Sequence, residues 1–250
     1  MSVESAGAGE VVIGRVLGES FGVLRRNALA LTAPALLYSL LPSVAVGVMA
    51  AMSEDPATAE DVARLGNLPV SLLTIALQAS VMAVIIQERR GRALTQQTAL
   101  AAAGRPYLLL LLLNIVTVLG IGAGLLLLIV PGVFLACAWA AAAPALVAEN
   151  KGVFDAMRRS WDLTRNNRWP IFLIFLILSV AVILTAVILG ALLAIVGGIG
   201  ETPTISSAIV EAVASTVFIV ISSAAAAVLY LELRALREGV GSESLAEVFS

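Results

Sequence analysis

The sequence has no histidine and only one cysteine, Cys137, among its 250 residues. Histidine is the commonest general base and a common metal ligand, so its absence excludes histidine-based catalysis and histidine-ligated metals. A single cysteine excludes an intramolecular disulfide and a cysteine-built zinc or iron–sulfur centre. Because Cys137 lies inside an apolar run, we interpret it as a small packing residue.

Charged residues are also scarce, at 13% of the chain, whereas apolar residues make up 60%. This apolar share is far above that of a soluble domain. With a net charge of −2 and a pI near 5.3, the chain lacks the basic footprint of a nucleic-acid-binding protein, and we expect no nucleic-acid partner. The composition predicts an all-α integral membrane protein, formed by one membrane domain over residues 1–250.

Six apolar stretches are long enough to cross a hydrocarbon core of about 30 Å. They cover residues 28–52, 68–87, two spans within 106–148, 169–196 and 206–230. The stretch 106–148 has no Asp, Glu, Lys or Arg and is about twice the length of one span, so it must turn back. We predict the turn at Val130-Pro131-Gly132. In the first span, Pro34 and Pro42 remove backbone donors and predict a bent or loosened helix.

The positive charges are sorted along the chain. Fourteen of the 15 Lys and Arg residues fall in four short segments that alternate with pairs of apolar spans. These segments are 1–27, 88–105, 149–168 and 233–250. The other connections, an acidic one over 53–68 and a glycine-rich one over 197–203, contain only Arg64. The positive-inside rule therefore predicts a multi-pass protein with both termini in the cytoplasm.

The same order predicts repeated units, because each pair of spans follows a basic segment with helical character. The three units cover residues 9–87, 88–149 and 150–232, and the polar tail covers 233–250. The first and third match best, since SFGVLRRN at 20–27 aligns with SWDLTRNN at 160–167. Each unit is predicted to consist of a cytoplasmic interfacial helix followed by a helical hairpin.

Residues 152–167 are predicted to form an amphipathic helix at the membrane surface. In a helix, Phe154, Met157 and Trp161 share one side, and the arginines point mostly elsewhere. The apolar side would enter the acyl boundary while the arginines meet anionic headgroups. The predicted contact residues are Arg158, Arg159, Trp161 and Arg165. In the alternative interpretation, the charges only set the topology and the helix packs against the floor of the bundle.

Polar side chains within the spans fall on stripes, which predicts that they face the bundle interior. The three most informative are Gln78, Asn114 and Glu211, in the second, third and sixth spans. Together they are the candidate polar site of a transporter. The alternative is that they only form hydrogen bonds between helices. Glu211, about five residues from the outer end of its span, would then reach interfacial water.

One string of residues carries a family resemblance. It comprises PGVF at 131–134, Trp139, APALVAE at 143–149 and GVFDAMRRSWDLTR at 152–165. The string resembles the membrane domain of glycerophosphoryl diester phosphodiesterases and the related uncharacterised bacterial six-span inner-membrane proteins. The resemblance implies a membrane module of the bacterial inner membrane. We do not expect the enzymatic activity to transfer, because no segment outside the spans can form a barrel of about 250 residues.

These observations lead to one main functional hypothesis and one alternative. The main hypothesis is a non-enzymatic inner-membrane module that engages membrane lipids, anionic ones above all, or a membrane protein partner through its inner-leaflet helices. The alternative is a small-solute or lipid transporter. No segment combines a nucleophile with a base or spaces the ligands of a metal, so we expect neither an enzyme nor a cofactor.

Overall fold

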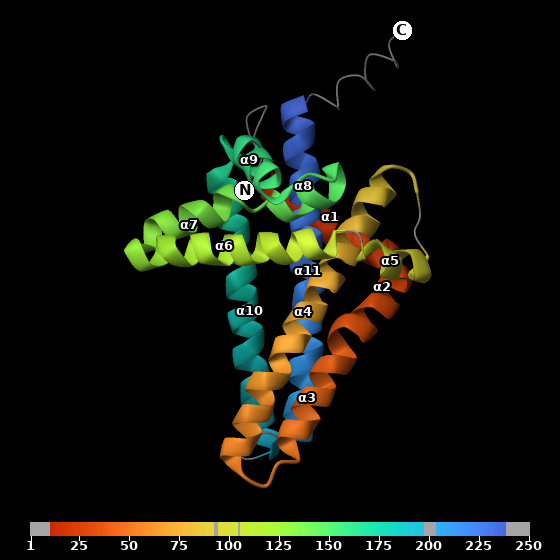
Figure 1. Cartoon of the computed structure of the whole chain (residues 1–250), viewed down its shortest axis with the longest axis vertical. Coiled ribbons are helices and arrows are strands. Elements are labelled where there is room, and N and C mark those ends of the chain that lie inside the picture. The colour runs from red at the N-terminus through yellow and green to blue at the C-terminus, as the bar shows by residue number, and fades with distance from the viewer. Residues whose placement is uncertain (1–10, 93–94, 105, 198–203, 239–250) are drawn as a thin grey trace, which may run out of the picture.

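The computed structural model describes residues 11–92, 95–104, 106–197 and 204–238, and the regular structure in these ranges is helical (Figure 1). Six helical segments are long and apolar enough to cross a membrane. They are Ala28–Ala51, Pro56–Arg89, Tyr107–Leu127, Ile129–Glu149, Arg168–Leu192 and Ile205–Glu238. The predicted all-α membrane fold with six candidate spans is therefore confirmed, and the chain has the architecture of a multi-pass membrane protein.

The first candidate span is loosened between its two prolines. It follows helix α1 (Ile13–Arg26) and consists of α2 (Ala28–Ala35), the π-helical turn η1 (Leu36–Leu40) and α3 (Leu41–Ala51). The π-helical turn confirms the prediction, because a proline deprives a carbonyl one turn earlier of its partner and the backbone must rearrange. Ser39 in this turn is buried, and its Oγ lies 2.8 Å from Oγ1 of Thr216 in α11 (Ile205–Glu238).

The acidic connection is much shorter than predicted, because α4 (Pro56–Arg89) begins at once. Asp55 is its N-cap and accepts a hydrogen bond from the Thr58 backbone N–H at 3.0 Å, which lowers the pKa of the Asp55 carboxyl. Pro56 occupies the first helical position, where its missing N–H costs nothing. Glu60 and Asp61 thus lie on the first turns of α4, and Glu54 and Asp55 directly precede the helix. The second predicted outer connection lies outside the described residues, apart from Gly197.

The uncharged stretch turns two residues before the predicted position. After α5 (Gln96–Ala102), helix α6 (Tyr107–Leu127) ends at Leu128, which is extended with φ −165° and ψ 150°, and α7 (Ile129–Ala138) follows. The two helices approach closely at a pair of glycines. A Cβ atom on Gly124 would lie 2.9 Å from the Cα of Gly132. Pro131 lies in the first turn of α7, as proline favours, so the turn closes before it and not around it.

The helices run in two directions (Figure 1). Helices α3, α4, α11 and α10 (Arg168–Gly197) follow the long axis of the molecule, whereas α6 and α7 lie across it. Helices α6 and α7 cross near one end of the molecule, where α1, α8 (Ala142–Glu149) and α9 (Val153–Thr164) also lie. We call this the basic end. The opposite end, with the turn at residues 52–55, is the acidic end.

Ion pairs bind α1 to the long helices at the basic end. Arg15 pairs with Glu232 of α11 at 3.6 Å, and Glu19 pairs with Arg89 at the end of α4. The core is concentrated at the same end, where Leu77, Ile85, Ile171, Tyr230 and Leu233 are fully buried. Nearer the acidic end the long helices expose apolar side chains such as Leu65, Leu68 and Ile183, as expected of surfaces that meet lipid. The three-unit repeat stays a prediction.

Candidate functional site

The exposed face of α9 carries aromatic and cationic residues in one line. Phe154, Arg158, Trp161 and Arg165 recur every three or four residues and are all exposed, with Phe154 at 74% and Trp161 at 38%. We call these four residues the α9 stripe. Met157, predicted to lie beside the two aromatic residues, is only 8% exposed and packs inward. The arginines therefore share the outer face with the aromatic rings.

The opposite face of α9 explains this difference. It is buried against α8 and the bundle, and its small side chains allow close approach. The buried residues are Val153, Ala156, Met157, Ser160, Leu163 and Thr164. The helix thus packs against the floor of the bundle, as the alternative interpretation stated, and still presents a second face outward. Sequence periodicity placed the helix, but only the position of α8 decides which of its faces is covered.

The four predicted contact residues divide into two groups. Within the described part of the chain, Arg158 and Arg165 form no ion pair, although Asp155 and Asp162 lie nearby on the helix. Arg159 instead points into the protein, where its Nε lies 3.0 Å from Oε1 of Glu149 and its Nη2 pairs with Glu238.

Burial alone would lower the pKa of the Arg159 guanidinium, but its hydrogen bonds with Glu149 and Glu238 outweigh this effect and raise it. Arg159 therefore belongs to the protein's own charge network and is not available to a ligand.

Arg168, at the start of α10, fixes the α9 stripe to α7. Its Cζ lies 4.1 Å from the centre of the Phe134 ring and 4.5 Å from that of Trp161. The two rings meet edge to face at 5.6 Å. Stacking of a guanidinium on aromatic rings is favourable, and it orients Trp161. The sequence string contains Phe134 and Trp161, but their meeting over Arg168 depends on the tertiary fold.

A hydroxyl from α9 completes a broken helix in the fourth candidate span. Between α7 and α8 the helix is interrupted at residues 139–141. Ser160 Oγ donates a hydrogen bond to the Ala138 carbonyl at 2.8 Å and accepts one from the Ala141 N–H at 3.1 Å. Thr164 Oγ1 lies 3.2 Å from the same carbonyl and 2.9 Å from the Ser160 carbonyl, so its one proton is shared between these two acceptors. The two hydroxyls satisfy buried backbone groups that have no other partner within a regular helix.

The interruption of the helix ends just before Pro144. Pro144 is the third residue of α8, so it lies in a first turn. A proline ring clashes with the carbonyl four residues earlier, which here belongs to Ala140 inside the interruption.

Glu149 is the centre of a charge network that joins α8, α9 and α11. Its Oε1 accepts hydrogen bonds from Arg159 Nε at 3.0 Å and from the Tyr230 hydroxyl at 2.8 Å. Its Oε2 lies 2.6 Å from Lys151 Nζ. Asn150, in the left-handed conformation with φ 50°, ends α8 and turns the chain towards α9. One carboxylate thus contacts Arg159 of α9, Tyr230 of α11 and Lys151, which indicates a role in holding these helices together.

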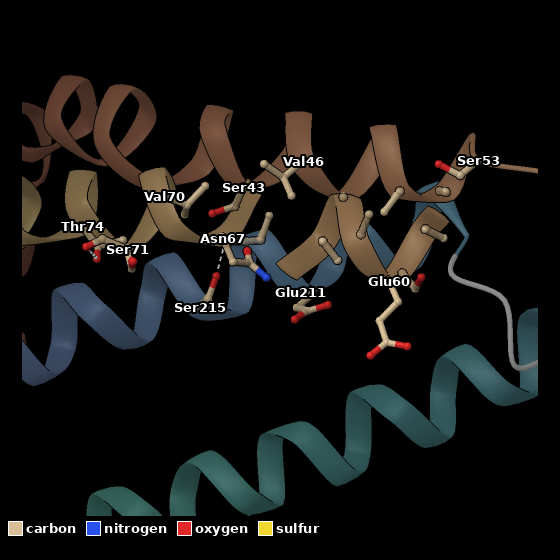
Figure 2. A pocket seen from close by; sticks show the side chains of 18 of the residues that line it. Ser43, Val46, Ser53, Glu60, Asn67, Val70, Ser71, Thr74, Glu211 and Ser215 are labelled. Carbon is tan, nitrogen blue, oxygen red and sulfur yellow. Dashed lines mark hydrogen bonds between the residues drawn. The ribbon is translucent and has the colours of Figure 1, made fainter. Parts of the chain in front are cut away.

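A second candidate site lies at the acidic end, between α3, α4 and α11. It is a cavity of about 760 Å³ (Figure 2). Its polar lining includes Ser43, Ser53, Glu54, Glu60, Asn67, Ser71, Thr74, Ser207, Glu211 and Ser215. The carboxylates of Glu60 and Glu211 lie on the side that faces α10 in Figure 2.

Several hydroxyls that line the cavity donate hydrogen bonds to backbone carbonyls. Ser71 donates to the Leu68 carbonyl at 2.7 Å, and Ser215 donates to the Ala212 carbonyl at 3.1 Å. Their oxygens can then only accept hydrogen bonds from a guest. Together with the carboxylates, they make the cavity rich in acceptors, which favours a ligand with cationic donors.

The three predicted intramembrane polar residues do not meet. Glu211 lines the cavity, but Gln78 and Asn114 are not among its lining residues. Asn114 Nδ2 donates to the Leu110 carbonyl in its own helix at 3.0 Å. Gln78 is half-buried on α4. The separation follows from the crosswise position of α6, which removes Asn114 from the cavity between α3, α4 and α11.

The fold and both sites belong to a multi-pass helical membrane protein. Residues 113–233 match the model of a family described as a domain of unknown function, DUF7847. The matched segment begins within α6 and includes the α9 stripe, Ser160, Arg168 and Glu149. No curated protein and no solved structure matches the chain. The resemblance to the membrane domain of glycerophosphoryl diester phosphodiesterases stays a prediction.

Proposed function

We propose that the protein is a non-enzymatic module of the bacterial inner membrane whose α9 stripe binds anionic lipid headgroups at the cytoplasmic face. The observation that carries this proposal is the exposure of Arg158 and Arg165 without an ion pair in the described residues, in line with exposed Phe154 and Trp161. A guanidinium binds a phosphate with two parallel hydrogen bonds, and an aromatic ring at this depth favours the boundary between headgroups and acyl chains.

The surroundings of the stripe support a preformed site. Arg168 stacks on Trp161 and Phe134, so the indole ring is ordered before any lipid arrives. The buried face of α9 is held by the Ser160 and Thr164 hydrogen bonds. A preorganised contact surface loses less conformational entropy on binding. The sorting of cations to the basic end supports the cytoplasmic orientation.

Replacing Arg158 and Arg165 together by glutamine is expected to weaken binding of phosphatidylglycerol about tenfold. Each arginine near the surface contributes roughly 1 kcal/mol, and Asp155 and Asp162 offset part of this attraction. Affinity is measured by titrating the detergent-solubilised protein with fluorescent phosphatidylglycerol and, in parallel, phosphatidylcholine. The wild type should prefer phosphatidylglycerol, and the preference should decline as salt is added.

The matched control is Asp155→Asn with Asp162→Asn, on the same exposed helix. This variant should bind phosphatidylglycerol at least as tightly as the wild type, because it removes the opposing charge. Equal affinity of wild type and arginine variant for phosphatidylglycerol would disprove the lipid role of the stripe. In that case, a membrane protein partner that depends on the same two arginines becomes the better explanation for their exposure.

The cavity at the acidic end favours one second candidate function, the binding of a small cationic solute. Its carboxylates and committed hydroxyls select a donor-rich guest, such as an organic amine. This candidate function keeps Glu211 of the predicted transporter site but does not involve Gln78 or Asn114.

Glu211→Gln is expected to weaken the binding of putrescine, used as the probe, about tenfold, because hydrogen bonds to a charged group contribute about 1.5 to 3 kcal/mol. Isothermal titration measures the affinity. The control is Asp61→Asn, which removes an acid from the same end of α4 but not from the cavity lining. If both variants bind like the wild type, or the wild type does not bind, the solute hypothesis is wrong.

A further inference from the structure

The α6–α7 hairpin has no acidic or basic side chain, and the rest of the protein covers little of its surface. Between residues 106 and 148 the sequence contains no Asp, Glu, Lys or Arg. At the tip, Leu126, Leu127, Leu128, Ile129 and Val130 are 70 to 90% exposed. An apolar tip of this size is stable only against another apolar phase. In a membrane protein, that phase is supplied by acyl chains.

The direction of the hairpin decides which acyl chains it meets. Helix α6 has about 21 residues and a length of roughly 31 Å, enough to cross a bilayer if it stood upright. It lies instead across the long helices, with α7 beside it (Figure 1). Length and composition alone therefore leave both arrangements open, and the packing against α4 selects the crosswise one.

The depth of the hairpin follows from its contacts with α4. Leu110 and Leu113 pack in one cluster with Ile75 and Ala79. The Tyr107 hydroxyl donates to the Leu72 carbonyl at 3.1 Å. Along α4, Ala79 lies about 14 Å and Leu72 about 24 Å from Glu88, which pairs with Arg26 at the basic end. The axis of α6 crosses the bundle nearer to the basic end than to the acidic end (Figure 1). The hairpin thus lies deeper than the charged groups of the basic end but on their side of the bundle.

We infer that the α6–α7 hairpin is immersed in the acyl chains of a single leaflet, the one at the basic end, with its tip pointing sideways into lipid. The backbone at the tip permits this. Both arms are helical, and the N–H of Leu128 donates to the Gly124 carbonyl at 3.0 Å. Pro131 in the first turn of α7 has no N–H, which further reduces the number of backbone donors exposed to hydrocarbon. An upright hairpin would place its apolar tip among the opposite headgroups.

The immersed hairpin makes the protein asymmetric across the bilayer. Helix α6, about 31 Å long, and helix α7, about 15 Å long, would together occupy roughly 460 Å² in one leaflet only if each is about 10 Å wide. The acyl chains of that leaflet are the binding partner of this surface. The inference is independent of lipid binding by the α9 stripe, since it concerns acyl chains and not headgroup charge.

The test measures which leaflet surrounds the tip. Leu128→Cys is labelled with a thiol-reactive fluorophore, and the protein is placed in vesicles of phosphatidylethanolamine and phosphatidylglycerol that carry nitroxide lipids in one leaflet only. Ser53→Cys at the acidic end and Phe154→Cys on α9 are labelled as references for the two sides. Cys137 is buried, so unaltered protein gives the background labelling.

Label at residue 128 should be quenched several-fold more strongly by nitroxides in the leaflet that quenches residue 154 than by those in the leaflet that quenches residue 53. Equal quenching, or stronger quenching from the leaflet of residue 53, would overturn the inference, because a crossing hairpin carries its tip to that side. The two references also report the orientation of the protein in the vesicle. An inverted protein, or one that does not bind phosphatidylglycerol, leaves the comparison intact.

Discussion

Replacing Glu149 by glutamine is expected to lower the free energy of unfolding by about 3 kcal/mol, because it removes the charged acceptor shared by Arg159 and Tyr230 and leaves Arg159 with Glu238 as its remaining carboxylate. Glu149 accepts hydrogen bonds from Arg159 and Tyr230 and pairs with Lys151, and its side chain is only 15% exposed. The amide keeps the size of the side chain but cannot neutralise Arg159. Unfolding in mixed micelles by denaturant, followed by circular dichroism, measures the loss.

A double-mutant cycle with Tyr230→Phe separates the network from a general disturbance. Tyr230→Phe alone should lower the free energy of unfolding by about 1.5 kcal/mol, since it removes the hydrogen bond from a buried tyrosine to a charged acceptor. In the double variant the two losses should not add, because both act on the same carboxylate. Glu60→Gln, an exposed acid at the acidic end, is the control and should change stability little. Additive losses would contradict the proposed network.

The second large effect concerns the interruption between α7 and α8. Ser160→Ala should destabilise the protein by about 2 kcal/mol, because the buried Ala141 N–H loses its acceptor. The Ala138 carbonyl keeps Thr164 Oγ1 within hydrogen-bond distance, so the loss of stability is smaller than if both backbone groups lost their partners. Hydrogen exchange should also become faster at Ala141 than in the neighbouring helices, since this amide depends on the Ser160 hydroxyl.

Ser80→Ala provides a matched control for this prediction. Ser80 is as completely buried as Ser160, but its hydroxyl donates to the Ala76 carbonyl within its own helix at 2.9 Å. Loss of the Ser80 hydroxyl removes no hydrogen bond between helices, and the free energy of unfolding should change by less than about 1 kcal/mol. Similar losses for Ser80→Ala and Ser160→Ala would show that the interruption does not depend on Ser160.

The number and limits of the candidate spans could be predicted because they depend on local composition. A run such as 169–196 is recognisable by its apolar length, and α10 covers it almost residue for residue. Likewise, Pro34 and Pro42 act on the backbone beside them, so the loosened helix was predictable. The cap of α4 at Asp55 and Pro56 carries a local signal too, but the acidic charge of the segment had suggested a loop.

Features that depend on which surfaces meet were not predictable in the same way. The covered face of α9, the stacking of Arg168 on Phe134 and the crosswise direction of α6 all require contacts between distant segments. Hydropathy does not reveal the orientation of a helix in the membrane, because a helix immersed in one leaflet and one that crosses the bilayer need the same apolar side chains. For the candidate sites, the sequence pointed to Trp161, which is exposed on the α9 stripe, and to Glu211, which lines the cavity. It did not predict that Arg159 pairs with Glu149 and Glu238. It missed Ser160 and Thr164 as partners of the backbone, although their spacing of four residues was a usable signal.

Helix α10 is attached chiefly near its beginning. Ile171 and Ile174 are buried and Arg168 is held by two rings, whereas Val180, Ile183 and Val187 further along are exposed. A rod fixed at one end transmits a small rotation there as a larger displacement at the other. A small rotation at Arg168 would therefore displace the exposed half of α10, which contributes no described residue to the lining of the acceptor-rich cavity.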